Sequence, residues 1–255
     1  MNIFCIDIGN TRTHCGTVTG GRVADATHIP TALLRDHAAP PEPIRAGVAG
    51  ADGIAYCSVV PAAGENLEAA FRASPAPVFH LTHKSCRGLD LVYPNPGEIG
   101  EDRIANALAA QAGYALPVVV IDMGTAVTFD VVTAKGYEGG IIAPGLELMT
   151  RYLHEQTALL PELAEADLAG IEGAIGKSTV DAMRLGVVVG FSGMLDALLA
   201  RVSRELRERG TGTPEVISTG GDLGALLSEW RDRTRFVPDL TLQGLAVGFE
   251  RRDTA

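Results

Sequence analysis

The chain has 255 residues, of which 46% are hydrophobic and 20% charged, and its net charge at pH 7 is −10. This hydrophobic share predicts a globular protein with a substantial core, because disordered chains have fewer apolar residues and a higher charge density. The negative charge argues against nucleic acid as a main partner, since duplex-binding surfaces are usually basic. ATP is not excluded, because backbone N–H groups and a divalent cation can hold its phosphates locally.

The four cysteines form no C-x-x-C pair and stand at Cys5, Cys15, Cys57 and Cys86. This usage predicts free thiols in a reducing cytoplasm. The longest apolar runs, such as Leu116–Ile121, are too short to span a bilayer. The first apolar stretch is interrupted by an aspartate and has no basic segment before it, so we expect no signal peptide. These features predict a cytoplasmic protein with no membrane partner.

Alternating and amphipathic patterns predict the elements of the first half of the chain. Three antiparallel strands in succession are expected at Asn2–Ile8, Thr11–Val18 and Arg22–Ile29. A Pro/Ala-rich surface connection is expected at Ala38–Pro43. A strand at Ile54–Val60, a helix at Gly64–Ala73 and a strand at Pro77–Leu81 follow. We then expect a loop at Tyr93–Gly100 and a helix from Asp102 or Arg103 to about Gly113.

The second half opens in the same way as the first. Strands are expected at Val118–Ile121 and Val127–Thr133. A long helix, a strand and a C-terminal helix follow, at Thr179–Arg209, Glu215–Ser218 and Thr241–Arg251. The later elements fit a second α/β lobe of similar design.

One short motif occurs twice, each time after an apolar strand: Asp7-Ile-Gly-Asn-Thr and Asp122-Met-Gly-Thr-Ala. The two copies lie about one domain length apart, which suggests an internal duplication. We therefore expect two similar α/β lobes, residues 1–116 and 117–255, with the boundary near Pro117.

In both D-x-G motifs the glycine can let phosphate oxygens approach the main chain, because it has no Cβ. Nearby hydroxyl and amide groups can donate to phosphate, from Asn10, Thr11, Thr13, Thr125 and Thr128. The aspartates can hold Mg²⁺, mostly through water. For a single motif an ordinary β-turn is the better explanation, but two copies at a lobe-sized spacing reverse that preference.

Two other nucleotide motifs are excluded. Gly173-Ala-Ile-Gly-Lys-Ser-Thr resembles a Walker A loop, but the glycine required five positions before Gly176 is replaced by Ile171, and no strand precedes it. No G-x-G-x-x-G follows the first strand, and the chain there continues into another strand where a dinucleotide fold would have a helix.

Two further segments each allow two interpretations. In Tyr93–Arg103, Asp102 could accept the proton of an attacking hydroxyl while Arg103 pairs with an anionic group, or Asp102 could be an N-cap and Arg103 a solvated residue. In Val216–Asp222, the Ser-Thr-Gly-Gly turn could admit adenine and ribose. It could equally be a plain join to a helix, whose apolar pattern is Leu223, Leu226 and Leu227.

Together these segments resemble one family, the type III pantothenate kinases, from residue 3 to about residue 249. The resemblance is carried by Asp7-Ile-Gly-Asn-Thr, Pro96-x-x-x-Gly100-x-Asp102-Arg103, Asp122-x-Gly-Thr-Ala-x-Thr-x-Asp130, Gly139-Gly-x-Ile-x-Pro-Gly145, Gly176-Lys-Ser-Thr179 and Ser218-Thr-Gly-Gly221. The second and third motifs are its specific parts. The resemblance implies an α/β fold of two duplicated ribonuclease-H-like lobes (actin-like ATPase superfamily), with mixed sheets flanked by helices.

The resemblance also implies the activity and its residues. The family phosphorylates pantothenate with MgATP, the first step of coenzyme A biosynthesis, as a cytoplasmic homodimer that needs K⁺ or NH₄⁺. ATP would be bound by Asp7, Ile8, Gly9, Asn10, Thr11, Arg12, Thr13 and Thr125. Pantothenate would be bound by Tyr93, Gly100, Glu101, Asp102, Arg103 and Thr179. Asp102 would be the catalytic proton acceptor, Asp7 would hold Mg²⁺ through water, and Asp122 would ligate the monovalent cation.

One position departs from the family pattern: Glu101 stands where many relatives carry alanine. Its carboxylate could raise the pKa of Asp102 by like-charge repulsion, or it could point to solvent. Two alternatives to the activity stay open. One is another kinase or phosphatase of the same superfamily, although exopolyphosphatase-like chains have three glycines where this chain has Gly124-Thr-Ala. The other is a nucleotide-binding regulator without catalysis.

Overall fold

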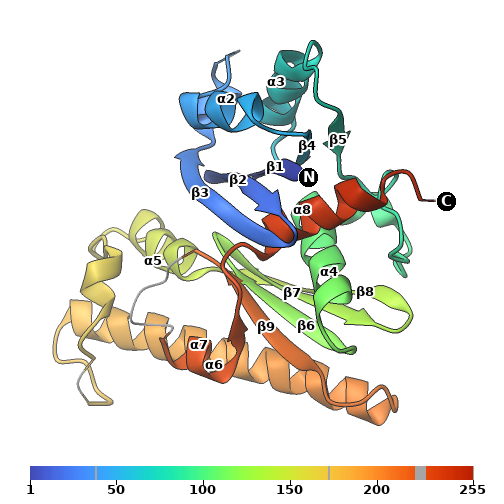
Figure 1. The fold of residues 1–255 in the computed structure, drawn as a ribbon. Coiled ribbons are helices and arrows are strands. Elements are labelled where there is room, and N and C mark those ends of the chain that lie inside the picture. Colours follow the sequence, from blue (N-terminus) through green and yellow to red (C-terminus); the bar gives the residue numbers. More distant parts are fainter. Residues whose placement is uncertain (38, 172, 222–227, 255) are drawn as a thin grey trace. The chain divides into compact units, whose positions relative to one another are not determined.

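The computed structural model describes residues 1–37, 39–171, 173–221 and 228–254. Its strands form two five-stranded sheets (Figure 1). The first sheet has the order β3-β2-β1-β4-β5 and consists of β1 (Asn2–Ile8), β2 (Arg12–Thr19), β3 (Arg22–Pro30), β4 (Gly53–Ser58) and β5 (Val78–His80). The strands β1, β2 and β3 form the predicted antiparallel meander, while β4 pairs in parallel with β1 and with β5.

The second sheet repeats this design. Its order is β10-β9-β6-β7-β8, and it consists of β6 (Val118–Met123), β7 (Ala126–Thr133), β8 (Gly136–Pro144), β9 (Glu215–Gly220) and β10 (Arg235–Phe236). In both sheets the first three strands lie next to one another in chain order. The fourth strand pairs with the first strand, on the side away from the second. The fifth strand pairs in parallel with the fourth in both sheets. The predicted duplication is therefore visible in the strand order.

Two compact units divide the chain, and both are discontinuous in sequence. Unit 1 comprises 1–120, 130–139 and 239–255, and unit 2 comprises 121–129 and 140–238. A single boundary near Pro117 does not describe these units, because two later segments return to unit 1. Three strands of the second sheet contribute residues to both units.

Unit 1 contains α1 (Ala32–Arg35), α2 (Glu42–Ala49), α3 (Pro61–Phe71), α4 (Glu101–Gly113), α8 (Leu240–Arg251) and a 3-10 turn at Pro96–Glu98. Its core includes the inward residues of β1 and β4 and the apolar faces of α2 and α3, among them Phe4, Ile54, Ile44 and Leu67. The helices α4 and α8 pack closely, since a Cβ on Gly244 would overlap the backbone of Ala105. The loop that precedes α4 therefore leads into a helix that is fixed by its neighbour.

Unit 2 contains α5 (Leu146–Glu155), a 3-10 turn at Glu165–Leu168, α6 (Thr179–Glu208) and α7 (Ser228–Arg233). Ser178 caps α6, because its hydroxyl accepts the N–H of Asp181 at 3.1 Å. A stripe of residues at four-residue spacing is buried along α6, at Met183, Val187, Phe191 and Leu195. Within the described part of the chain, α6 is the one helix long and apolar enough to cross a bilayer, by length and composition alone.

Several element bounds differ from those expected. The helix α3 begins at Pro61, because proline is well suited to the first turn of a helix. The helix α2 begins at Glu42, within the expected connection at Ala38–Pro43, whose first residue lies outside the described residues. The strand β8 and the helix α5 were not predicted. The helical pattern expected at 222–227 also lies outside the described residues.

Candidate active site

The first D-x-G motif forms a short turn between β1 and β2 in unit 1. The N–H of Gly9 donates to the carbonyl of Arg12 at 3.1 Å. Thr31 holds the turn from the side of α1, since its N–H donates to Thr11 O at 3.1 Å and its hydroxyl to Gly9 O at 2.7 Å. Asn10, Thr11 and Arg12 are exposed on this fixed turn.

Two residues expected to bind ATP have buried side chains. The side chain of Ile8 belongs to the core of unit 1. Thr13 is fully buried, and its hydroxyl lies 3.0 Å from that of Thr31. This burial argues against the Thr13 hydroxyl as a direct phosphate donor, because it serves to fasten the turn.

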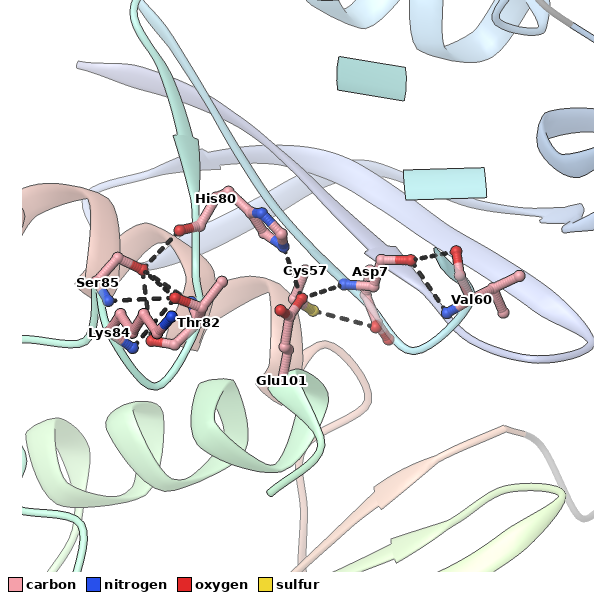
Figure 2. A network of polar contacts seen from close by, with 9 residues as sticks. Asp7, Cys57, Val60, His80, Thr82, Lys84, Ser85 and Glu101 are labelled. Atoms are coloured by element: carbon pink, nitrogen blue, oxygen red, sulfur yellow. Dashed lines mark hydrogen bonds and ion pairs between the residues drawn. The ribbon is translucent and has the colours of Figure 1, made fainter. Parts of the chain in front are cut away.

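Asp7 lies beside Cys57 across the parallel pair β1–β4. The thiol of Cys57 donates to Asp7 Oδ1 at 3.3 Å (Figure 2). Burial and the negative charges of Asp7, Asp102 and Glu101 hold the pKa of the Cys57 thiol well above its usual value. The thiol is therefore a proton donor at neutral pH, and the carboxylates expected to bind ATP and pantothenate gather around it.

The helix α4 begins at Glu101, with Gly100 at the N-cap position and no side-chain cap. The interpretation of Asp102 as the N-cap is therefore wrong. Its Oδ1 accepts the N–H of Arg103 at 2.8 Å. Burial raises the pKa of Asp102, the backbone N–H and charge of Arg103 partly offset this, and Glu101 adds a smaller rise. A Cβ on Gly100 would lie 2.5 Å from Asp102 Oδ1, so the glycine provides the space for this carboxylate.

Arg103 is not a solvated helix residue, since its side chain is only 12% exposed. Its Nε donates to Oδ1 of the fully buried Asp130 at 2.7 Å, and the hydroxyl of Tyr137 donates to the same oxygen at 3.0 Å. Burial raises the pKa of Asp130 to about 6, against the opposing effect of Arg103. The pair is thus ionised at neutral pH, and the guanidinium is held in one orientation.

Asp130 and Tyr137 were not predicted as site residues. A signal for Asp130 was available in the sequence. Asp130 ends the second D-x-G motif two residues after Thr128 on β7, and this spacing places the two side chains on the same face of the strand. Tyr93 lies near the same group, with its ring centroid 6.4 Å from that of Tyr137. The structure therefore brings Tyr93, Asp102 and Arg103 together in unit 1.

An open cavity of about 460 Å³ in unit 1 borders the loop that precedes α4. It is lined by residues that follow β4 and β5 and by the loop before α4, among them Ser58, Thr82, Lys84, Gly97 and Gly100. The cavity has the size of a small-molecule site.

Unit 2 contains Asp122, Thr125 and Thr179. The second D-x-G turn lies between β6 and β7, where Gly124 N donates to Ala126 O at 3.1 Å. Thr179 is exposed and is the first residue of α6. These residues and those of the first turn belong to different compact units.

Two glycines approach the second turn through bare backbone. Gly145 N donates to Thr125 O at 3.0 Å, and a Cβ on Gly145 would overlap the Gly124 carbonyl. Gly220 has a φ of +107° and a Cβ there would lie 2.5 Å from Met123 O. The Ser-Thr-Gly-Gly segment thus ends against the second D-x-G motif. Glycine is required at position 220 because a side chain there would overlap the backbone of the second turn.

No set of three His, Cys, Asp or Glu side chains that could hold a metal occurs among the described residues.

Solved structures identify the fold. A structure described as a putative Baf family transcriptional activator from Campylobacter jejuni matches 99% of this chain and 100% of its own, with a TM-score of 0.64 and 18% identity. An activator of 2-hydroxyisocaproyl-CoA dehydratase from Clostridium difficile, solved with bound ADPNP, matches 99% and 96%, with a TM-score of 0.51 and 11% identity. The chain shares the fold of these structures, an α/β fold with two mixed sheets flanked by helices.

Relatives in sequence identify the family. The family model described as type III pantothenate kinase matches residues 3–201. A type III pantothenate kinase of Akkermansia muciniphila is 43% identical over 77% of both chains. One of Streptomyces avermitilis is 36% identical over 98% of both. The chain belongs to the type III pantothenate kinase family.

Proposed function

We propose that this protein transfers the γ-phosphoryl group of ATP to the hydroxyl of pantothenate, the first step of coenzyme A biosynthesis. The family match carries the reaction, and one observation carries the mechanism: the Asp102 carboxylate accepts the backbone N–H of Arg103, whose guanidinium Asp130 holds in place. As a member of its family the protein is an ATP-dependent phosphotransferase. The free buried cysteines agree with a reducing cytoplasm as its location.

In the proposed mechanism Asp102 accepts a hydrogen bond from the attacking hydroxyl and orients its oxygen. A carboxylate is a weak base towards an alcohol, so this contribution is mostly positioning, although burial raises the pKa of Asp102 in the useful direction. Arg103 neutralises negative charge on the substrate or on the transferred group. The transition state is loose, so orientation and charge neutralisation supply most of the catalysis.

ATP is assigned to the two D-x-G turns. The exposed Asn10, Thr11 and Arg12 and the backbone near Thr125 would donate to its phosphates. Mg²⁺ bound with ATP would neutralise charge on the phosphate oxygens, and Asp7 would hold it through water. The backbone of Gly220, close to the second turn, suits the adenosine portion.

The direct test is ADP release by the purified protein with pantothenate and with a panel of sugars. Rapid ADP formation with pantothenate alone is the expected result. Turnover only with a sugar would assign the protein to another kinase of the superfamily, while nucleotide binding without turnover would support a regulator that has lost catalysis.

We also propose a monovalent cation at Asp122, near the end of β6. Activity should be high in K⁺ or NH₄⁺ and low in Na⁺ at equal ionic strength, because the smaller Na⁺ fits a site of fixed size poorly. Steady-state rates in the three chloride salts measure this. Equal rates in all three would remove the cation from the mechanism.

The protein is proposed to be a homodimer joined through α6. At three glycines on this helix, Gly186, Gly190 and Gly193, the position a Cβ would take is open: no heavy atom of the described residues lies within 4 Å, apart from the adjoining backbone of the helix itself. The neighbouring Val189 is 59% exposed. A face of small residues permits close approach of a second helix, and a two-fold axis would pair α6 with its copy. Only 17% of the most apolar 18-residue stretch of α6 is buried within the chain. Pairing with a second copy would cover this apolar surface without requiring a membrane.

A further inference from the structure

Glu101, the first residue of α4, directs its side chain inward, where it is 20% exposed. Its Oε2 accepts the N–H of Ser58 at 2.8 Å and lies 2.8 Å from Nε2 of His80 (Figure 2). The expectation that this side chain points to solvent is therefore wrong. Both partners lie outside α4, one at the end of β4 and the other at the end of β5.

His80 is itself held in place. Its ring stacks on Tyr56 with centroids 4.4 Å apart and planes 11° apart. The hydroxyl of Ser85 donates to the carbonyl of His80 at 2.6 Å. The imidazole therefore offers Glu101 a hydrogen-bond partner whose position is set by the first sheet.

The two bonds matter because no side-chain cap holds the N-cap position of α4. Its N-cap is Gly100, which has no side chain to cap the helix. Helix ends without caps fray readily, and Asp102 lies in this first turn. The carboxylate of Glu101 connects that turn to Ser58, the neighbour in sequence of Cys57, whose thiol donates to Asp7.

We propose that Glu101, held by His80, is a positioning residue for phosphoryl transfer, which fixes the Asp102 carboxylate relative to the first phosphate turn. The proposal rests on the function proposed above. In this interpretation Glu101 touches neither substrate, although it lies within the predicted pantothenate-binding segment. It acts through the backbone of α4 and β4, so its loss should affect kcat more than the KM for ATP.

The test uses purified full-length variants. Glu101→Ala removes both bonds, and His80→Phe removes one while keeping a ring to stack on Tyr56. Glu101→Gln retains an oxygen that can accept both. We expect Glu101→Ala to lower kcat about 10-fold and His80→Phe about 3-fold to 5-fold, from the usual strength of one or two hydrogen bonds. The double variant should be no worse than Glu101→Ala alone, because the two residues act as a unit.

Two readouts separate positioning from simple destabilisation. Glu101→Gln should recover most of kcat, yet the acidic limb of its pH–rate profile should move to lower pH, because a negative charge near Asp102 has been removed. The other charged groups near Asp102 are Arg103 and Asp130, and the Asp7 carboxylate lies against the neighbouring Cys57 thiol. All three are unchanged in this variant. Glu65→Ala, on the exposed face of α3, is the matched control and should be as active as wild type.

Full kcat for Glu101→Ala, or effects of Glu101→Ala and His80→Phe that multiply in the double variant, would overturn the proposal. A drop in melting temperature with unchanged kcat per active site would show a purely structural role and would overturn it too. These outcomes are distinct from failure of the proposed function, which would appear as absence of pantothenate-dependent ADP release by the wild-type protein.

Discussion

Replacing Asp102 with asparagine should lower kcat by roughly 10²–10⁴-fold, the usual loss for a positioned acid–base group. Asparagine has the same shape and can still accept the N–H of Arg103, but it cannot take a proton from the hydroxyl. Folding and MgATP binding should change little. Coupled ADP-release kinetics, thermal unfolding and nucleotide titration measure the three quantities.

The pH dependence gives a second readout of the same residue. Because burial raises the pKa of Asp102, the carboxylate becomes protonated, and turnover is lost, at a higher pH than for an ordinary aspartate. The Asp102→Asn variant should lack this acidic limb. Asp25→Asn, on the exposed strand β3, is a matched control that should keep full activity. Near-normal turnover with reduced stability in Asp102→Asn would contradict the catalytic role.

Much of the fold was predictable because its signals are local. Alternation predicted the meander over β1 to β3, and the helical pattern predicted α6 to within one residue. The repeated D-x-G motif predicted a duplicated design, and the strand order of the two sheets agrees. The strand β8 was missed, because its glycines and its short separation from β7 weaken the alternating pattern.

The contacts of the predicted site residues depend on segments that are distant in sequence. Nothing near Arg103 in sequence indicates that Asp130 and Tyr137 would fix it, since β7 and β8 must first fold against α4. Thr13 has a suitable hydroxyl for phosphate, yet its pairing with Thr31 appears only once α1 is in place. Likewise, the alternatives for Glu101 omitted a histidine that β5 presents to it.

The proposed homodimer leads to the second large expected effect. Two inactive variants, Asp102→Ala and Thr179→Tyr, should regain about a quarter of wild-type activity when their subunits are exchanged in equal amounts. The reason is that Thr179 stands exposed at the start of α6, the helix proposed to join the two protomers. If each pocket combines Asp102 of one protomer with Thr179 of its partner, half of the dimers are mixed and half of their pockets are intact.

Subunit exchange is confirmed by mass spectrometry of the mixed dimers, and activity is measured in the same sample. If both residues serve one chain's own pocket, every pocket keeps one lesion and no activity returns.

Gly190→Leu, added to both variants, tests the route through α6. Leucine favours the helix by about 1 kcal/mol over glycine, and within the chain the position is open, so the protomer should fold. A leucine on each of two closely packed helices would nevertheless hold them apart, and recovery should then disappear. Recovery that survives Gly190→Leu would place the shared pocket at an interface other than this face of α6.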